Sequence, residues 1–217
     1  KAAQKIYNDA VEQILKTYTR TLDPKTGLNR HAWDETNHTF WADKETGLSQ
    51  HCWGRGFGWY TIAIVDVLDY LPADYAGREV LINILQKICA ELPKWADPET
   101  GVWYQVLDQP GREGNYLEAT CSAMFTYAYL KAVRLGYIDQ SYKEYAVDLY
   151  DKLVKTFIST DEQGRISLEQ CCSVGGLGGS NNRMGDYAYY LSEPIRPNDS
   201  KGVGPFIWAS LEIEQLK

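Results

Sequence analysis

Two kinds of helical segment alternate along the chain, and this alternation constrains the fold more than any other feature. Three segments place apolar side chains on one face only, as surface helices do: residues 3–19, 78–93 and 141–158. Three others are apolar or small nearly all round, which predicts buried helices: residues 58–71, 118–135 and 204–215. Units of one outer and one inner helix bury their inner helices only by stacking side by side, so we expect a curved or closed helical array.

A short phrase separates the elements of this array. It reads DPKTGL from Asp23, DKETGL from Asp43, DPETGV from Asp97 and DEQGRI from Asp161. The aspartate can accept hydrogen bonds from backbone N–H groups two residues on, and the glycine supplies a left-handed conformation, so we predict tight turns. The oxygen ligands of an EF-hand loop are missing, which argues against calcium. A short extended stretch should follow three of the turns: LNRHAW, VWYQVLD and ISLEQCC.

Composition excludes several classes of partner and cofactor. The net charge of −7 argues against nucleic acid and anionic membranes, and no apolar run approaches the roughly 20 residues of a membrane span. Three histidines and five cysteines show no metal-ligand spacing, so we expect buried free thiols and neither metal nor cofactor. The length fits one domain, residues 1–217, and the N-terminus begins within a helix, which suggests truncation of a longer chain.

Arg55 is the most unusual candidate for a functional site. It stands in WGRGFGWY (residues 53–60) at the start of an apolar helix, and no acidic residue follows before Asp66. Asp66 lies about three helical turns away, too far to be a natural partner. A buried arginine is costly unless paired, so Arg55 either pairs with a distant segment or binds an acidic ligand.

Aromatic and polar residues in the irregular segments complete the candidate set. Aromatic side chains beside a few polar groups suit a small polar ligand such as a sugar. The candidates are His31, Trp33, Trp53 and Trp59, followed by Arg30, Asp34, Trp41 and Glu118. Structural roles remain open for several of them: core packing for Trp53 and Trp59, a core hydrogen bond for His31, and capping for Asp34 and Glu118. The SVGGLGGSNN segment lacks the spacing of a dinucleotide-binding loop, and no catalytic triad can be assembled.

Four ordered motifs, spread over essentially the whole chain, resemble the unsaturated rhamnogalacturonyl hydrolases of glycoside hydrolase family 105. They are GLNRHAWDE, WGRGFGWY with its helix ending LDYLP, YLEATCSAMFTYAYLKA and NDSKGVGPFIWA. The resemblance implies an all-α (α/α)6 barrel, of which residues 1–217 cover the C-terminal half, about three helical hairpins. It implies oligosaccharide substrates from pectin or rhamnogalacturonan that carry a 4,5-unsaturated uronic acid at the non-reducing end.

The resemblance also implies a reaction and a set of site residues. Water adds across the vinyl-ether double bond, with an aspartate as general acid and base, and the hemiketal then releases the sugar. The family's substrate-binding histidine, arginine and tryptophan match His31, Arg55 and Trp59. Two departures stand out. Asn29 and Arg30 replace an aromatic pair before the histidine, and the family's catalytic aspartates lie upstream of this chain, so we expect no catalytic residue here.

Other functions remain open on the sequence alone. A different (α/α)6 carbohydrate enzyme, such as an epimerase or an inverting glycosidase, would also line its mouth with tryptophan and arginine. However, His31, His38 and His51 form no evident catalytic pair. A non-catalytic carbohydrate-binding fragment is the second alternative, and a half barrel should self-associate through its open edges. A bacterial cytoplasmic or periplasmic setting follows only from the resemblance.

Overall fold

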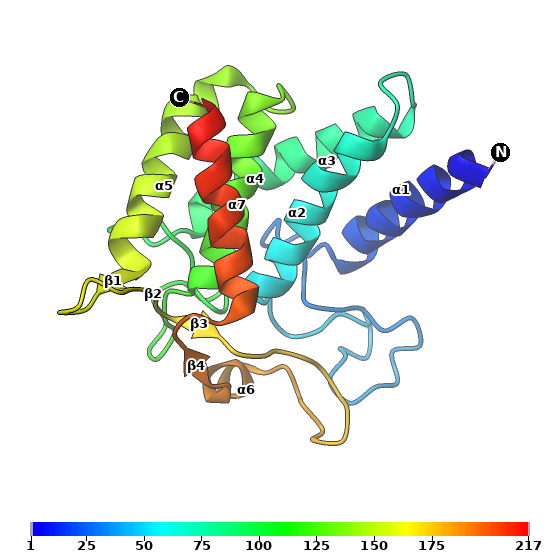
Figure 1. The fold of residues 1–217 in the computed structure, drawn as a ribbon. Helices are drawn as coiled ribbons and strands as arrows, with labels where there is room; N and C mark the ends of the chain where they lie inside the picture. Colours follow the sequence, from blue (N-terminus) through cyan, green and yellow to red (C-terminus); the bar gives the residue numbers. More distant parts are fainter. Residues whose placement is uncertain (1, 217) are drawn as a thin grey trace.

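The computed structural model describes residues 2–216, and six long helices of this range alternate as predicted (Figure 1). They are α1 (Ala2–Thr21), α2 (Gly54–Tyr70), α3 (Gly77–Glu91), α4 (Ala119–Arg134), α5 (Lys143–Phe157) and α7 (Ser200–Leu216). Shorter helices are η1 (Leu92–Trp95), η2 (Gln140–Tyr142) and α6 (Tyr187–Ser192). Helix α2 begins four residues before its predicted start, which places Arg55 within its first turn.

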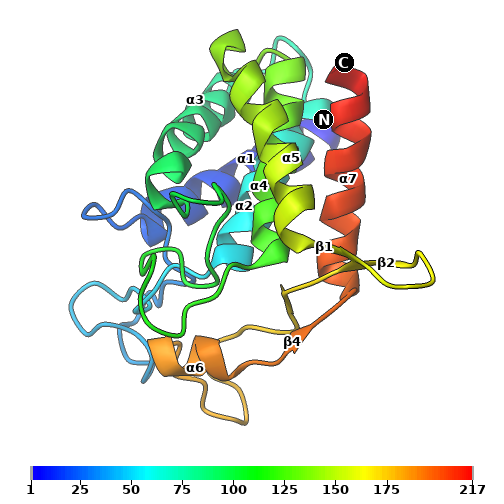
Figure 2. The ribbon, with the colours of Figure 1, turned by 90° about the vertical axis from the view of Figure 1, so that its left-hand side faces the viewer.

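The helices form two layers. Helix α4 packs between α2 and α7, and these three make the inner layer. Helices α1, α3 and α5 pack against them from outside, as Figure 2 shows from the side. One hydrophobic core joins both layers, with Leu68, Leu85, Phe125 and Leu149 among its buried members. Three outer–inner pairs side by side match the predicted partial barrel.

The inner helices differ in how completely they are covered. Nearly all of α4 is buried, in agreement with its apolar character all round. Helices α2 and α7 flank it, and each leaves one face uncovered, with Trp59 and Tyr70 exposed on α2 and Ile207, Trp208 and Leu211 exposed on α7. The prediction that all three inner helices are buried is therefore wrong for α2 and α7, because they lie at the two ends of the inner layer.

The four repeated phrases form the predicted turns. Gly27, Gly47, Gly101 and Gly164 all have φ between 71° and 75°. Each leading aspartate accepts a backbone N–H within the turn, for example Asp23 from Lys25 at 2.9 Å and Asp97 from Thr100 at 2.8 Å. The left-handed glycine conformation explains why this residue recurs at the same place.

The extended segments pair less regularly than predicted. The strands are β1 (Ile158–Thr160), β2 (Ile166–Leu168), β3 (Cys171–Cys172) and β4 (Ile195–Arg196), and they form two antiparallel pairs, β1–β2 and β3–β4. In the first two units the chain makes only isolated bridges, such as Trp33 with Leu48 and Trp53 with Val106. Helix α7 starts at Ser200, so Pro205 lies inside it.

The inner helices share one orientation, and their N-termini meet the irregular segments at one end of the molecule, which we call the mouth (Figure 1). All five cysteines are buried free thiols, as predicted. None of the helices between residues 2 and 216 combines the length and apolar character needed to cross a membrane.

Candidate active site at the mouth of the helical layer

Arg55 is buried at the mouth, and its charge helps to lower the pKa of the Asp199 carboxyl without a direct ion pair. Its residue is 1% exposed, and no carboxylate within residues 2–216 forms an ion pair with it. One guanidinium nitrogen, Nη1, donates a hydrogen bond to the Cys172 carbonyl, whereas Nε has no hydrogen-bond partner in the described chain. Asp66, the nearest acid in the sequence, instead accepts from Tyr127 and Lys131. A buried cation with unused donor capacity is expensive unless it meets a ligand.

Trp53 forms one wall of the Arg55 environment. The guanidinium carbon lies 4.9 Å from the centre of the indole ring, which is a cation–π distance. The Trp53 Nε1 donates to the Gln105 side-chain oxygen at 3.2 Å, and Gly175 packs directly on the ring face. A Cβ atom at position 175 would come within 2.4 Å of the ring, so only glycine fits there. The SVGGLGGSNN segment is therefore a close-packed cover over Trp53.

His31 lies beside Trp53, with 4.7 Å between the ring centres. Its Nδ1 is 2.7 Å from the hydroxyl of Tyr190, a fully buried residue of α6. Burial lowers the pKa of His31 to about 4, so its imidazole is neutral at pH 7. A neutral imidazole can position a ligand by hydrogen bonding, but it cannot act as a general acid at this pH.

Trp59 occupies a different position from Trp53. It lies one helical turn after Arg55 on α2 and is 40% exposed on the uncovered face of the inner layer. Trp33 lies in the loop before α2, where its Nε1 donates to the Thr46 carbonyl and its ring packs under the Arg20 guanidinium. The structure thus brings His31, Trp53 and Arg55 together, with Trp59 one turn away and Trp33 outside this cluster.

Arg30 is held by acidic residues of the protein. It forms ion pairs with Asp23 and, at 3.0 Å, with Asp108. The same Asp108 lies 3.0 Å from His51 and accepts the Cys52 N–H, so it ties the 104–117 loop to the segment before α2. Burial raises the pKa of the Asp108 carboxyl, but His51, the Cys52 N–H and Arg30 outweigh it and lower the pKa overall. Arg30 therefore supplies little net charge to a ligand, because Asp23 and Asp108 neutralise it.

Trp41 borders an open hollow next to this ion cluster. The hollow has a volume of about 660 Å3, and its lining includes Phe40, Trp41, Arg30 and His51. This volume is within the range of small-molecule sites. Trp41 also lies close to Gly178, which joins the hollow to the 173–185 segment that covers Trp53.

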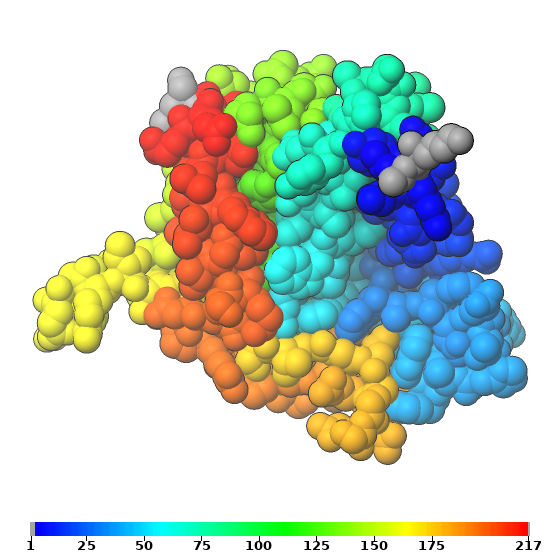
Figure 3. All heavy atoms as spheres, turned by 45° about the vertical axis from the view of Figure 1, so that its right-hand side comes forward, coloured from blue at the N-terminus to red at the C-terminus, as the bar shows by residue number. Residues whose placement is uncertain are grey.

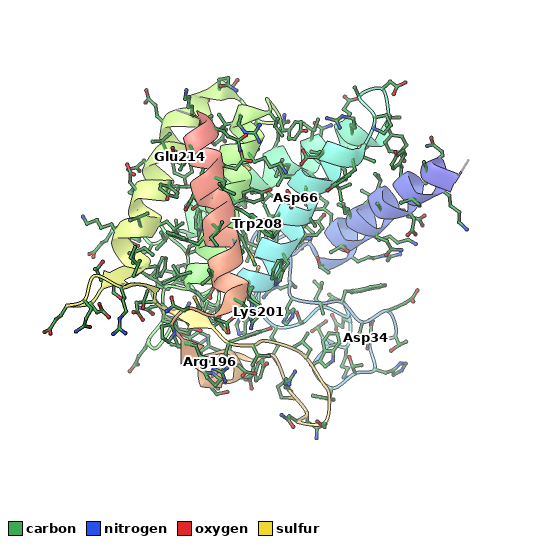
Figure 4. The ribbon with its side chains drawn as sticks, viewed as in Figure 1. Asp34, Asp66, Arg196, Lys201, Trp208 and Glu214 are labelled. Carbon is green, nitrogen blue, oxygen red and sulfur yellow. The ribbon has the colours of Figure 1, made fainter. Side chains whose placement is uncertain are left out.

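Asp34 and Glu118 both have structural roles. Asp34, labelled in Figure 4, accepts hydrogen bonds from the backbone and hydroxyl groups of Thr36 and Thr39, which hold the pKa of its carboxyl far below the usual range. Glu118 is fully buried, caps α4 by accepting the Cys121 N–H at 2.7 Å, and accepts the Cys172 N–H at 2.9 Å. Neither carboxylate is placed to donate a proton to a ligand at Arg55.

Two residues of the cluster, Gln105 and Tyr190, were not among the sequence candidates. Gln105 donates its amide to the Cys172 sulfur at 3.0 Å, and Tyr190 holds His31. Gln105 could have been found as a candidate, because it is a polar residue within the largely apolar segment VWYQVLD. Tyr190 gave no such signal, because its partner His31 is 159 residues away in the sequence.

The sequence of this chain matches a known family over its full length. The family model of Glycosyl Hydrolase Family 88 matches residues 1–217. The chain belongs to Glycosyl Hydrolase Family 88. This membership supports a glycoside hydrolase and does not favour the epimerase or the non-catalytic binding module.

Solved structures of longer proteins contain the same fold. A glycoside hydrolase from family 105 of C. acetobutylicum ATCC 824 superimposes with a TM-score of 0.95 and 47% identity over 97% of this chain. A possible member of family 105 from Salmonella enterica serovar Paratyphi A gives a TM-score of 0.75 and 30% identity over 94% of this chain. This chain spans only 59% and 49% of those two proteins, respectively.

A curated relative has the size of this chain. The "24.9 kDa protein in picA locus" of Rhizobium radiobacter is 36% identical over 213 residues, which cover 95% of this family 88 chain and 90% of the relative. The present chain has a mass of 24.7 kDa. This relative is therefore similar in size to the present chain.

Proposed function

We propose that this chain forms the uronate-binding part of a glycoside hydrolase that removes a 4,5-unsaturated uronic acid from the non-reducing end of pectin- or rhamnogalacturonan-derived oligosaccharides. The observation that carries the proposal is Arg55, a buried guanidinium with an unpartnered Nε and no carboxylate partner among residues 2–216. A sugar carboxylate would satisfy both the charge and the free donor, because a guanidinium fork can donate two parallel hydrogen bonds to one carboxylate.

The neighbouring side chains suit a sugar ring. Trp59 offers a flat apolar face one turn from Arg55, and His31 offers a hydrogen-bonding nitrogen next to Trp53. The hollow beside Trp41 is a place for the sugars that follow the uronate. Arg55 is closed from solvent by the Cys172 carbonyl and Trp53, so a ligand carboxylate has to displace that carbonyl.

In our proposal, this chain does not supply the residue that donates the proton. Hydration of the double bond needs a general acid, and His31 is neutral while Asp34 and Glu118 are occupied by backbone N–H groups. These observations support the family resemblance, in which the catalytic aspartates lie on a preceding half of the barrel. The activity then belongs to an assembly larger than this chain.

Two measurements on an unsaturated galacturonyl-rhamnose disaccharide test the proposal. The conjugated double bond absorbs ultraviolet light, so hydration appears as a loss of absorbance, and calorimetry reports binding. We expect binding without hydration by the chain alone. Hydration above the buffer rate would show that a proton donor lies within these residues, and absence of both signals would refute the uronate site. The same disaccharide with a reduced carboxyl group is the control and should bind weakly.

A further inference from the structure

The short helix α6 lies at the mouth, and two of its tyrosines contact parts of the candidate site. Figure 3 shows the amber segment around residue 175 against the blue loop between α1 and α2. The Tyr190 hydroxyl lies 2.7 Å from His31 Nδ1, and the Tyr190 ring is nearly parallel to the Trp53 ring, with 6.4 Å between the ring centres. The neighbouring Tyr189 hydroxyl accepts the Gly176 N–H at 2.9 Å. Helix α6 therefore supports both His31 and the glycine-rich cover over Trp53.

The Tyr190 hydroxyl has one acceptor in the described chain, the His31 ring. Tyr190 is fully buried, and its hydroxyl forms no other hydrogen bond within residues 2–216. Burial raises the pKa of Tyr190, so the phenol keeps its proton at pH 7. If Nδ1 of His31 carried a proton and donated it to the phenol oxygen, the hydroxyl proton would be buried without an acceptor, at the full cost of desolvation. The hydroxyl therefore donates to Nδ1.

The direction of this hydrogen bond decides where the His31 ring carries its own proton. The imidazole is neutral at pH 7, because burial lowers its pKa to about 4. A neutral imidazole has one N–H group, so when Nδ1 accepts a hydrogen bond the proton must be on Nε2. His31 is partly exposed, and its Nε2 makes no hydrogen bond within residues 2–216. The Nε2–H group is therefore available to a ligand as a donor.

The Nε2 edge of the His31 ring lies near the first turn of α2, which contains Arg55. The His31 Cδ2 atom, which is bonded to Nε2, would be 3.5 Å from a Cβ atom added at Gly56. Trp53, at the N-cap position of α2, makes no side-chain capping hydrogen bond, and the Arg55 Nε has no partner in the described chain. The imidazole, the guanidinium and the N-terminal turn of a helix all present N–H groups, and such a set suits an oxygen acceptor, a carboxylate above all.

We infer that Tyr190 is a positioning residue: its hydroxyl fixes the His31 tautomer that presents Nε2–H, near Arg55, as a hydrogen-bond donor to the ligand. The inference rests on the proposed function for the identity of that ligand, a uronate. It makes His31 a donor, so that His31 and Arg55 bind the same class of atom, an oxygen acceptor. The opposite tautomer would instead accept a proton from a sugar hydroxyl.

Nuclear magnetic resonance of the chain with isotope-labelled histidine tests the tautomer without a ligand. Proton–nitrogen correlation spectra at pH 7 distinguish a protonated from an unprotonated ring nitrogen, and the His31 signals are those missing from His31→Gln. We expect Nδ1 to be unprotonated and Nε2 to be protonated in the unmodified chain. Tyr190→Phe keeps the aromatic ring and removes only the hydroxyl, so the Nδ1 signal should change. A residue that only packed against His31 would leave the tautomer as it was.

Calorimetry with the unsaturated disaccharide tests whether this tautomer serves binding. Tyr190→Phe should raise the dissociation constant about three- to tenfold, the contribution of one oriented hydrogen bond. Tyr187→Phe is the matched control, because its hydroxyl belongs to the same helix but donates to the Arg112 and Glu113 carbonyls, and its affinity should be unchanged. In the His31→Ala background, Tyr190→Phe should have no further effect, since Tyr190 acts through His31.

The outcomes separate this inference from the proposed function. A protonated Nδ1 in the unmodified chain would overturn the inference, and so would an equal loss of affinity from Tyr190→Phe with and without His31. Failure of the unmodified chain to bind the disaccharide would refute the proposed uronate site, whereas the role of Tyr190 in fixing the tautomer is still decided by the spectra recorded without ligand.

Discussion

The Nδ1 atom of His31 and the hydroxyl of Tyr190 lie 2.7 Å apart, although 159 residues separate them in the sequence. This contact fixes the loop before α2 to the short helix α6 and holds the His31 ring against Trp53. The mouth of the helical layer is therefore closed by long-range contacts between irregular segments, whereas the layer itself is built from helices adjacent in sequence.

The burial of His31 predicts a pH dependence of stability. Its pKa is about 4 in the folded protein and near 6.5 in the unfolded chain. Between these values the unfolded state binds more protons, so the free energy of unfolding falls as the pH drops from 6.5 towards 4 and is unaffected by His31 above 6.5. Urea unfolding at pH 5 and pH 7.5 should show a loss about 1–2 kcal/mol larger in the unmodified chain than in His31→Gln.

The comparison with His31→Gln removes the contribution of the carboxylates. Asp23 and Asp108 also have lowered pKa values and lose stabilising charge at low pH, but they do so in both proteins. An identical pH dependence in the two proteins would mean that folding does not shift the pKa of His31.

The helices could be predicted from the sequence because their signals are local. Apolar periodicity located all six long helices, and the turn glycines appeared at the expected positions. The site was only partly predictable. Arg55 was visible as a cation in an apolar setting, but the role of Arg30 depends on Asp108, which is 78 residues away. Tyr190 belongs to a six-residue helix whose pattern gives no indication of His31. Contacts between irregular segments leave no periodic trace in the sequence.

Glu118 should matter for stability. Its removal leaves the first turn of α4 without its cap and the Cys172 N–H without an acceptor, both in a fully buried environment. We expect Glu118→Ala to lower the free energy of unfolding by about 2–4 kcal/mol, from the loss of the cap and the unsatisfied donor together. Asp139→Ala, which removes an exposed cap from η2, is the control and should cost about 0.5–1 kcal/mol. Similar losses in both variants would contradict the buried role of Glu118.

Substitutions of two tryptophans distinguish the hydrophobic core from the uncovered face of the inner layer. Trp103 is fully buried, packs edge-to-face on Phe125 and donates to the Leu92 carbonyl at 2.8 Å. Trp103→Ala should therefore cost about 3–5 kcal/mol of stability. Trp59→Ala should cost less than about 1 kcal/mol of stability, because Trp59 is 40% exposed. A large loss of stability in Trp59→Ala would place Trp59 in the core instead of on the uncovered face of α2.

Arg55 should be needed for binding but not for folding. We expect Arg55→Ala to weaken binding of the unsaturated disaccharide by about 1.5–3 kcal/mol, the contribution of a charged hydrogen bond. Arg55→Lys keeps the charge but loses the planar guanidinium, so its affinity should lie between those of the unmodified chain and Arg55→Ala. Calorimetry with the charged disaccharide and its carboxyl-reduced form measures the effect, and an equal loss for both sugars would rule out the carboxylate contact.

Arg55→Met distinguishes this role from a structural one. Methionine has no charge and fills much of the space of the arginine side chain. The substitution removes the hydrogen bond from Arg55 Nη1 to the Cys172 carbonyl. Replacement of a buried, unpaired cation by an apolar side chain of similar volume is expected to leave the free energy of unfolding unchanged or to raise it. The same variant should lose affinity for the charged disaccharide as Arg55→Ala does. An Arg55→Met variant that keeps its affinity for the charged disaccharide but loses stability would show that the guanidinium stabilises the fold. Unchanged or increased stability together with lost affinity is expected only if Arg55 binds the ligand.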